Sequence, residues 1–142
     1  MTDNARIAAY KAFLRINDGA FSNLISDFSK LSDIDRAFAE AIAIGTLERK
    51  LTLEFVLSRR IKADTKKNVT ALLMTGLYQI LYMENVPDYA AINQAVGLCP
   101  VFKKTSAKGL VNAVLRKCIG FDITKEKFKD RTTELSVKYS VD

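Results

Sequence analysis

The sequence contains no histidine, only two cysteines and two prolines, and six glycines. Histidine is the commonest general base and a frequent metal ligand, and the two cysteines do not stand at metal-ligand spacing. We therefore expect no metal site and no catalytic residue in this chain. The glycines are scattered singly, so no glycine-rich loop is expected to bind a nucleotide or a methyl-donor cofactor. No uninterrupted apolar run approaches the roughly 18 residues of a membrane span, and no membrane partner is expected.

The two cysteines, Cys99 and Cys118, are too few for the disulfide framework of a small secreted protein. The N-terminal residues Met-Thr-Asp-Asn also lack the charged and apolar regions of a signal peptide, so a cytoplasmic location is expected. Cys118 falls on the apolar side of its predicted helix and is expected to be a buried, inert thiol. Cys99 precedes Pro100 and is expected in a turn, where its thiol can be exposed.

The chain has 142 residues, of which 49% are hydrophobic, and this is enough for one sizeable core but hardly for two. Its formal net charge is +6, and its isoelectric point is about 9.4. Such a balance suggests a polyanionic partner such as nucleic acid, although basic globular proteins without such a partner also exist.

The apolar residues recur at helical spacing, with almost none of the alternation that is typical of strands, so the expected fold class is all-α. The expected helices cover residues 4–16, 21–31, 34–60, 67–85, 90–98 and 110–119. The helix over 67–85 is the most hydrophobic of them and is expected to lie at the centre of the domain.

Local signals predict where these helices begin, bend and end. Asp33 is expected to cap the helix over 34–60, and Asp88 the helix that follows Pro87. A bend or break is expected near Gly45-Thr46, because an interior glycine usually marks close packing or a kink. The helix over 90–98 is expected to end before Pro100, since proline lacks an amide hydrogen and clashes within a helix.

The stretch from Ala107 to Lys117 combines a core-forming face with a basic face. A helix that begins near Gly109 places one set of side chains on an apolar arc, namely Leu110, Val111, Val114, Leu115 and Cys118. Arg116 and Lys117 then face away from that arc. Asn112 lies at the edge of the arc, where we expect its amide to bond a neighbouring backbone group.

No acidic residue occurs between Asp88 and Asp122. Five basic residues lie in this interval, namely Lys103, Lys104, Lys108, Arg116 and Lys117. The lysines and nearby hydroxyl groups precede a helix N-terminus, whose amide hydrogens and dipole attract phosphate oxygens. An ordinary solvated face is an equally good interpretation of this charge alone.

Two other basic segments have less specific interpretations. The run of Arg59, Arg60, Lys62, Lys66 and Lys67 is expected to be a solvated connector between helices. The tail over residues 123–142 mixes charges of both signs with few apolar residues, and is expected to be a surface helix or a linker.

Four blocks in order resemble the NusB-like domain and span most of residues 5–121. They are Asp35-Arg36-Ala37-Phe38 leading to Gly45-Thr46-Leu47, then Gly76-Leu77-Tyr78-Gln79, then Pro87 with Ala91-Ile92-Asn93-Gln94-Ala95-Val96, then Gly109-Leu110-Val111-Asn112-Ala113-Val114-Leu115-Arg116. The last block is similar to the N-terminal domain of the Sun/RsmB group of ribosomal RNA cytosine-5 methyltransferases. Free-standing antitermination factors of the NusB type more often have Phe-Val-Asn-Gly-Val-Leu there.

This resemblance implies a compact bundle of about seven helices, with an RNA-binding domain over residues 1–122 that helps to recognise small-subunit (16S) ribosomal RNA. The implied catalytic domain uses S-adenosylmethionine and packs against this domain in the full-length protein. We expect the catalytic domain to be missing from this chain. The chain itself would then be no enzyme and would bind no cofactor. The alternative is a free-standing antitermination factor of the NusB type that binds RNA and a ribosomal protein in the regulation of transcription. A second copy of the chain, in a weak homodimer, is a further candidate partner. In the antitermination factors an arginine-bearing region of the first helix contacts RNA, and the residues that correspond to it here are Arg6, Lys11 and Arg15. Charge and helical phase add the other expected RNA-binding residues, namely Lys103, Lys104, Lys108, Arg116 and Lys117.

Overall fold

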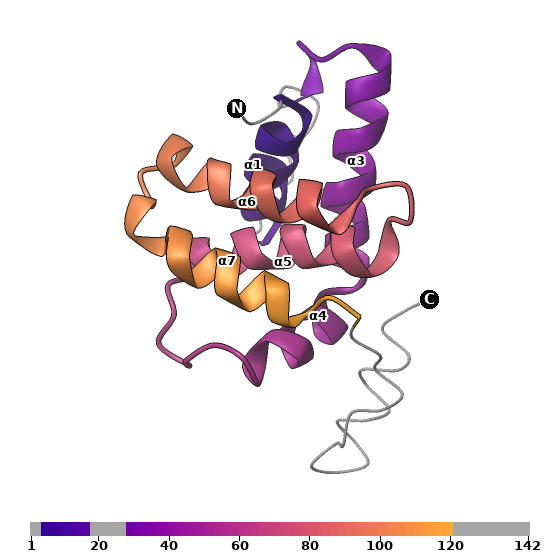
Figure 1. Ribbon diagram of the computed structural model, residues 1–142. Helices are drawn as coiled ribbons and strands as arrows, with labels where there is room; N and C mark the ends of the chain where they lie inside the picture. Colours follow the sequence, from indigo (N-terminus) through magenta and orange to yellow (C-terminus); the bar gives the residue numbers. More distant parts are fainter. Residues whose placement is uncertain (1–3, 18–27, 121–142) are drawn as a thin grey trace.

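The computed structural model describes residues 4–17 and 28–120. Most of the predicted helix over 21–31, and the whole tail over 123–142, lie outside these residues. Within them the chain is helical and contains no strand, so the all-α prediction is confirmed (Figure 1). The helices are α1 (Asn4–Asn17), α3 (Asp33–Glu48), α4 (Lys50–Ser58), α5 (Lys67–Tyr82), α6 (Asp88–Val101), the 3-10 helix η1 (Thr105–Ala107) and α7 (Lys108–Lys117). None of these helices is long and apolar enough to cross a membrane.

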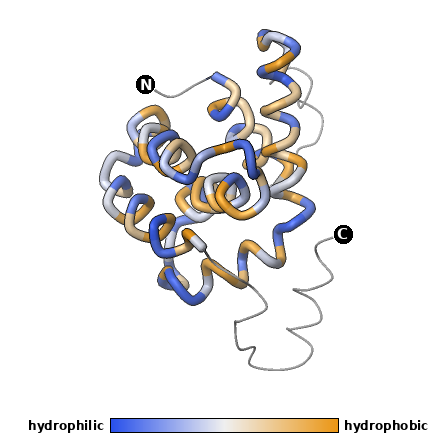
Figure 2. The backbone as a smooth tube through the Cα atoms, turned by 45° about the vertical axis from the view of Figure 1, so that its right-hand side comes forward, coloured by the Kyte–Doolittle hydropathy of each residue, from blue (hydrophilic) through white to orange (hydrophobic). Residues whose placement is uncertain are grey.

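Helix α5 is the centre of the described part of the molecule, as its composition predicts. It contacts α1, α3, α4, α6 and α7, and every residue from Ala71 to Leu77 is buried. Figure 1 shows α6 and α7 running alongside α5, whereas α1 and α3 stand across this layer. Figure 2 shows the hydrophobic residues concentrated on the inner helices and the hydrophilic ones in the outer connections. A helix that is apolar on most sides has to be covered on most sides.

The core has two parts of different composition. The larger part surrounds α5 with bulky side chains such as Tyr10, Phe13, Leu53 and Leu115. The smaller part lies between α1 and α3 and consists mainly of alanines from both helices. Alanine side chains allow two helix backbones to approach closely, and α1 and α3 share the most extensive contact between any two described elements.

The helix predicted over 34–60 is two helices, and the predicted position of the break is wrong. The chain leaves helical geometry at Arg49 (φ −106°, ψ 18°), whereas Gly45 and Thr46 continue α3. Gly45 marks close packing instead, because a Cβ atom there would overlap the Tyr78 ring. The predicted cap is also displaced by one residue: the Ser32 side chain accepts a hydrogen bond from the Asp35 amide (3.2 Å), and Asp33 is the first helical residue.

Helix α6 differs from its prediction at both ends. It begins at Asp88 with Pro87 as the preceding cap residue, so Asp88 is not the cap. It continues through Pro100 to Val101, and the expected end before Pro100 is therefore wrong. In the last turn proline removes only one amide donor, and the end is closed by the Phe102 amide, which donates to the Leu98 carbonyl (3.1 Å).

Candidate nucleic-acid interface

A tight turn after α6 presents the first two candidate lysines. Lys103 has a φ of 59°, in the left-handed region that few non-glycine residues adopt. The amide of Lys104 donates to the Cys99 carbonyl (2.6 Å), and the Ala107 amide donates to the Lys104 carbonyl (2.8 Å). The turn therefore folds back into η1, with Lys103 exposed and Lys104 half-buried just before the start of α7.

The N-terminus of α7 has no side-chain cap. Ala107 occupies the cap position, and the first turn holds no acidic residue. Lys108, the first residue of the helix, is exposed. The Lys108 amide donates to the Thr105 carbonyl of η1. The amide hydrogens that follow it in the first turn have no acceptor within α7, and they add to the positive end of the helix dipole. This end of α7 therefore suits a phosphate group.

The two faces of α7 agree with the predicted helical phase, except at one position. Val111, Val114, Leu115 and Cys118 are buried, while Arg116 and Lys117 are exposed. The expected burial of Leu110 is wrong, because this side chain remains 40% exposed. Ala107, Val111, Val114, Leu115 and Cys118 contact the core, so Leu110 lies at the edge of the buried face.

Asn112 does not bond a neighbouring backbone group as expected. Its side-chain oxygen Oδ1 accepts a hydrogen bond from Nε of Arg116, at 3.0 Å on the exposed surface of α7. The two residues are four apart, the spacing at which helix side chains meet. Asn112 therefore orients the Arg116 guanidinium on the basic face.

The α1 residues Arg6, Lys11 and Arg15 have different surroundings. Nε of Arg6 donates to Oε1 of Gln79 in α5 (2.7 Å), and its guanidinium lies 5.0 Å from the centre of the Phe38 ring in α3. Arg6 therefore links α1, α3 and α5. Lys11 is exposed and Arg15 is half-buried.

Tyr10 brings the middle of α1 beside the lysine turn. Its ring centre lies 4.6 Å from that of Phe102, which immediately precedes Lys103. Its hydroxyl donates to the Asn68 carbonyl at 3.0 Å. Burial raises the pKa of Tyr10 to about 12, so the hydroxyl remains protonated at neutral pH. This contact places α1 close to the end of α6, whereas Arg6 belongs to the α3 side of the molecule.

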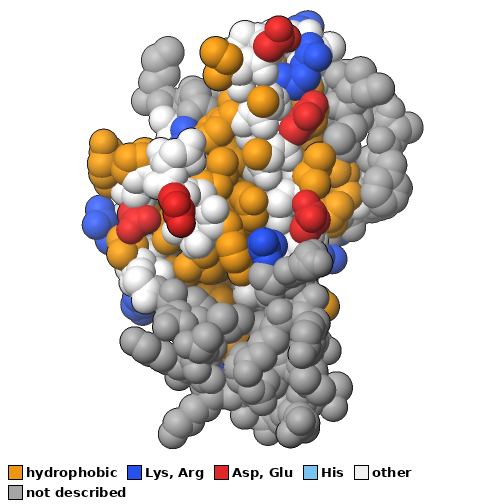
Figure 3. Space-filling model, turned by 90° about the vertical axis from the view of Figure 1, so that its right-hand side faces the viewer, with side chains coloured by type: hydrophobic (Ala, Val, Ile, Leu, Met, Phe, Trp, Pro, Cys, Tyr) orange, Lys and Arg blue, Asp and Glu red, His pale blue; other side chains and the backbone are white. Residues whose placement is uncertain are grey.

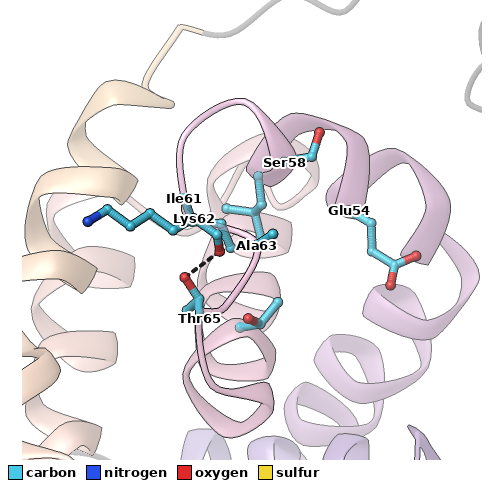
Figure 4. Close-up of a pocket in the computed structure, with 8 residues that line it drawn as sticks. Glu54, Ser58, Ile61, Lys62, Ala63 and Thr65 are labelled. Atoms are coloured by element: carbon cyan, nitrogen blue, oxygen red, sulfur yellow. Dashed lines mark hydrogen bonds between the residues drawn. The ribbon is translucent and has the colours of Figure 1, made fainter.

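The connector between α4 and α5, which was expected to be solvated, adds exposed basic residues to this side of the molecule. Lys62, Lys66 and Lys67 are exposed there. Burial raises the pKa of the Cys118 thiol, and the positive charge of Arg60 opposes part of that rise, so Arg60 lies near the C-terminal end of α7. Figure 4 shows the Lys62 side chain extending to the side of α7. The run of positive charge in the sequence was the available signal, but its position beside α7 is a tertiary feature.

A pocket of about 280 Å³ lies under this connector (Figure 4). Its lining residues are Glu54, Leu57, Ser58, Ile61, Lys62, Ala63, Thr65 and Thr70. The Ser58 hydroxyl donates to the Phe55 carbonyl (2.7 Å), and the Thr65 hydroxyl donates to the Lys62 carbonyl (2.7 Å). These hydroxyls stabilise the local backbone, and the pocket lacks a paired nucleophile and base.

Both cysteine thiols are buried. The predicted burial of Cys118 is therefore confirmed, and the predicted exposure of Cys99 is wrong. Sγ of Cys99 lies 3.7 Å from the Ala95 carbonyl oxygen, which accepts its hydrogen bond. Burial raises the pKa of both thiols, so they remain in the unreactive protonated form at neutral pH. Among the described residues, no group of three histidine, cysteine or acidic side chains lies close enough to hold a metal ion.

Comparison with known proteins identifies relatives of this chain. The NusB family model matches residues 3–120. The chain is 35% identical over 120 residues to ribosomal RNA small subunit methyltransferase B of Pseudomonas putida, which covers 80% of the chain and 27% of that protein. The proteins of the same name from Pseudomonas syringae pv. tomato and Proteus mirabilis are 36% and 34% identical, each over 80% of the chain and 26% and 28% of their own length. The chain thus spans about a quarter of the length of these relatives.

Proposed function

The chain belongs to the NusB family, and we propose that it is the RNA-binding accessory domain of a 16S ribosomal RNA (cytosine-5) methyltransferase. The similarity to small-subunit ribosomal RNA methyltransferases over residues of this domain supports the proposal. In this view the S-adenosylmethionine-dependent reaction belongs to a separate catalytic domain. The present chain supplies affinity for the RNA substrate.

The observation that carries the proposal is the basic face around the N-terminus of α7. Lys103 and Lys104 precede η1 and Lys108 begins α7, whose N-terminus has no side-chain cap. Arg116 and Lys117 add exposed positive charge at the other end of the helix. No acidic residue interrupts the sequence from residue 89 to residue 121. Lysine and arginine side chains and helix N-termini are the usual phosphate-binding groups in nucleic-acid complexes.

The connector and α1 extend this face in the proposal. In Figure 4 the Lys62 side chain extends toward α7. The Tyr10 ring packs against Phe102 and so holds α1 beside the turn that carries Lys103. Lys11 and Arg15 are then the α1 residues placed to meet the same RNA. Arg6 contributes mainly by holding α1 against α3 and α5. Because these groups bind phosphates, they position the RNA and do not read its sequence.

Charge reversal tests the basic face directly. The triple variant K103E/K104E/R116E should bind a structured fragment of small-subunit ribosomal RNA at least about tenfold more weakly, since every phosphate that the protein no longer neutralises also keeps its counterions. Fluorescence anisotropy at several salt concentrations measures both the affinity and its salt dependence. The slope of log K against log salt should fall by about 2 to 3, which is one unit or slightly less for each phosphate that is no longer neutralised.

A matched control separates this face from overall charge. Lys30, Arg36 and Lys50 lie before α3, in its first turn and at the start of α4, and none of them belongs to the proposed basic face. The variant K30E/R36E/K50E has the same net charge as the test variant. It should lose much less affinity and keep its salt slope. Equal losses in the two folded triple variants would rule out a dedicated basic face.

A further inference from the structure

The outward side of α3 carries an apolar stripe that the described residues leave uncovered. Ile34 is 82% exposed and Ile44 is 42% exposed, and Ala37 and Ala41 between them are exposed as well. Their spacing of three, four and three residues places them on one side of the helix. Single exposed apolar residues are ordinary, but a contiguous stripe of this kind marks an interaction surface.

Part of this stripe forms a groove between α3 and the Tyr78 side chain of α5. The groove has a volume of about 360 Å³ and is lined by Ala37, Glu40, Ala41, Ile44, Gly45, Glu48 and Tyr78. Gly45 lets the Tyr78 ring lie directly against the α3 backbone, because a Cβ atom there would overlap it. The tyrosine ring therefore forms a wall, and small side chains form the floor.

The small residues have the spacing that receives another helix. Ala37 and Ala41 are exposed and four residues apart, so they form a row beside which a neighbouring helix can insert its own ridge of side chains. The row ends at Gly45, which the Tyr78 ring covers. Ile44 and the Tyr78 ring stand on either side of this row as lining residues. A helix with medium-sized apolar side chains therefore fits this groove.

The charge of the groove is opposite to that of the whole protein. Glu40 and Glu48 line it, and no lysine or arginine does; Arg36 is on the same helix, outside the lining. Among the described residues, neither carboxylate is paired with a basic side chain. Figure 3 shows this side of the molecule, where apolar side chains gather and both acidic and basic side chains stand among them. A complementary surface would carry lysine or arginine beside its apolar residues.

We propose that the groove between α3 and Tyr78 binds an amphipathic helix of a protein partner, with an apolar stripe on the floor and lysine or arginine side chains beside Glu40 and Glu48. This surface is separate from the basic face, so the partner and RNA can bind at the same time. The inference does not depend on RNA binding.

Two synthetic peptides test the proposal with the full chain. One 15-residue peptide has leucine and alanine on one helical face and lysine elsewhere, and the other has glutamate in place of each lysine. Isothermal titration calorimetry should show binding of the lysine peptide at low salt, and amide shifts of Ala37 and Ala41 in NMR spectra should locate it. E40Q/E48Q should weaken this binding about tenfold, and A41R at least as much.

The control is A113R, which adds the same side chain at an exposed alanine in the middle of α7. It should leave the affinity for the lysine peptide unchanged, and A41R should leave the affinity for RNA unchanged. The proposal is overturned by absence of binding, by equal binding to A41R, or by tighter binding of the glutamate peptide at the groove. It is also overturned if the groove is occupied by a second copy of the chain, seen as a dimer in sedimentation that A41R dissociates and the lysine peptide does not.

Discussion

Helices α3 and α7 both pack against α5 with one face, yet their outward faces have opposite chemistry. The outward face of α7 carries Arg116 and Lys117, with an uncapped and basic N-terminus. The outward face of α3 carries exposed Ile34 and Ala41, with two acidic residues in its groove. The net charge of +6 is therefore an average over two unlike surfaces. The net charge alone suggests a polyanionic partner, but it gives no sign of the acidic surface on α3, which suits a partner with basic side chains.

The two helices also meet α5 differently, although each interface depends on a glycine. Leu115 of α7 is fully buried against Gly76 of α5, where an added Cβ atom would lie 3.0 Å from Leu115 Cδ1. Gly45 of α3 lies under the half-buried Tyr78 ring of α5. The α7 interface thus belongs to the core, whereas the α3 interface lies at the edge of an open groove.

The largest expected effect concerns the attachment of α7. The substitution L115A should lower the free energy of unfolding by about 2 to 5 kcal/mol, because it removes a buried side chain and leaves a cavity beside Gly76. Urea denaturation followed by circular dichroism measures this change. The neighbouring L110A, at a 40% exposed position, should cost less than about 1 kcal/mol. If the two substitutions cost the same, α7 is not oriented as described.

The helical phases and the central position of α5 were predictable, because apolar spacing is a local property of the sequence. Two kinds of feature were not. From the local sequence alone, a glycine inside a helix predicts a break at Gly45. Its actual role in packing depends on Tyr78, which is distant in the sequence. Adjacent Ser32 and Asp33 can both cap a helix, and only the backbone geometry decides between them.

The candidate site shows the same division between local and tertiary information. The outward positions of Arg116 and Lys117 followed from helical phase and are confirmed. The connector carrying Lys62 joins that face only because α4 and α7 both pack against α5, which no local pattern encodes. Cys99 is buried because α6 continues past it, beyond the end that Pro100 suggested.

A smaller effect is expected from the N-termini of the two helices, of which only α3 has a side-chain cap. S32A should lower the free energy of unfolding by about 1 kcal/mol, since the Asp35 amide loses its acceptor. A107S at the equivalent position of α7 should change it by less than about 0.5 kcal/mol, because the backbone there (φ −88°, ψ −4°) is not in the extended geometry of a capping residue. Thermal unfolding of both variants measures the difference. A gain in stability from A107S would show that α7 accepts a cap after all.

The smallest effect is expected on the outward face of α7 itself. N112A removes the acceptor of the Arg116 side chain, and exposed pairs at this spacing contribute about 0.2 to 0.5 kcal/mol. A double-mutant cycle of N112A and R116A should give a coupling energy of that size. If N112A alone lowers the free energy of unfolding by more than about 1 kcal/mol, Asn112 makes a buried hydrogen bond to the backbone instead. A small value has a functional consequence. The basic face of α7 then contributes little to the stability of the fold, so Arg116 can exchange its hydrogen bond to Asn112 for one to a phosphate at little cost in free energy. Arg6 differs in this respect, because its guanidinium holds α1, α3 and α5 together.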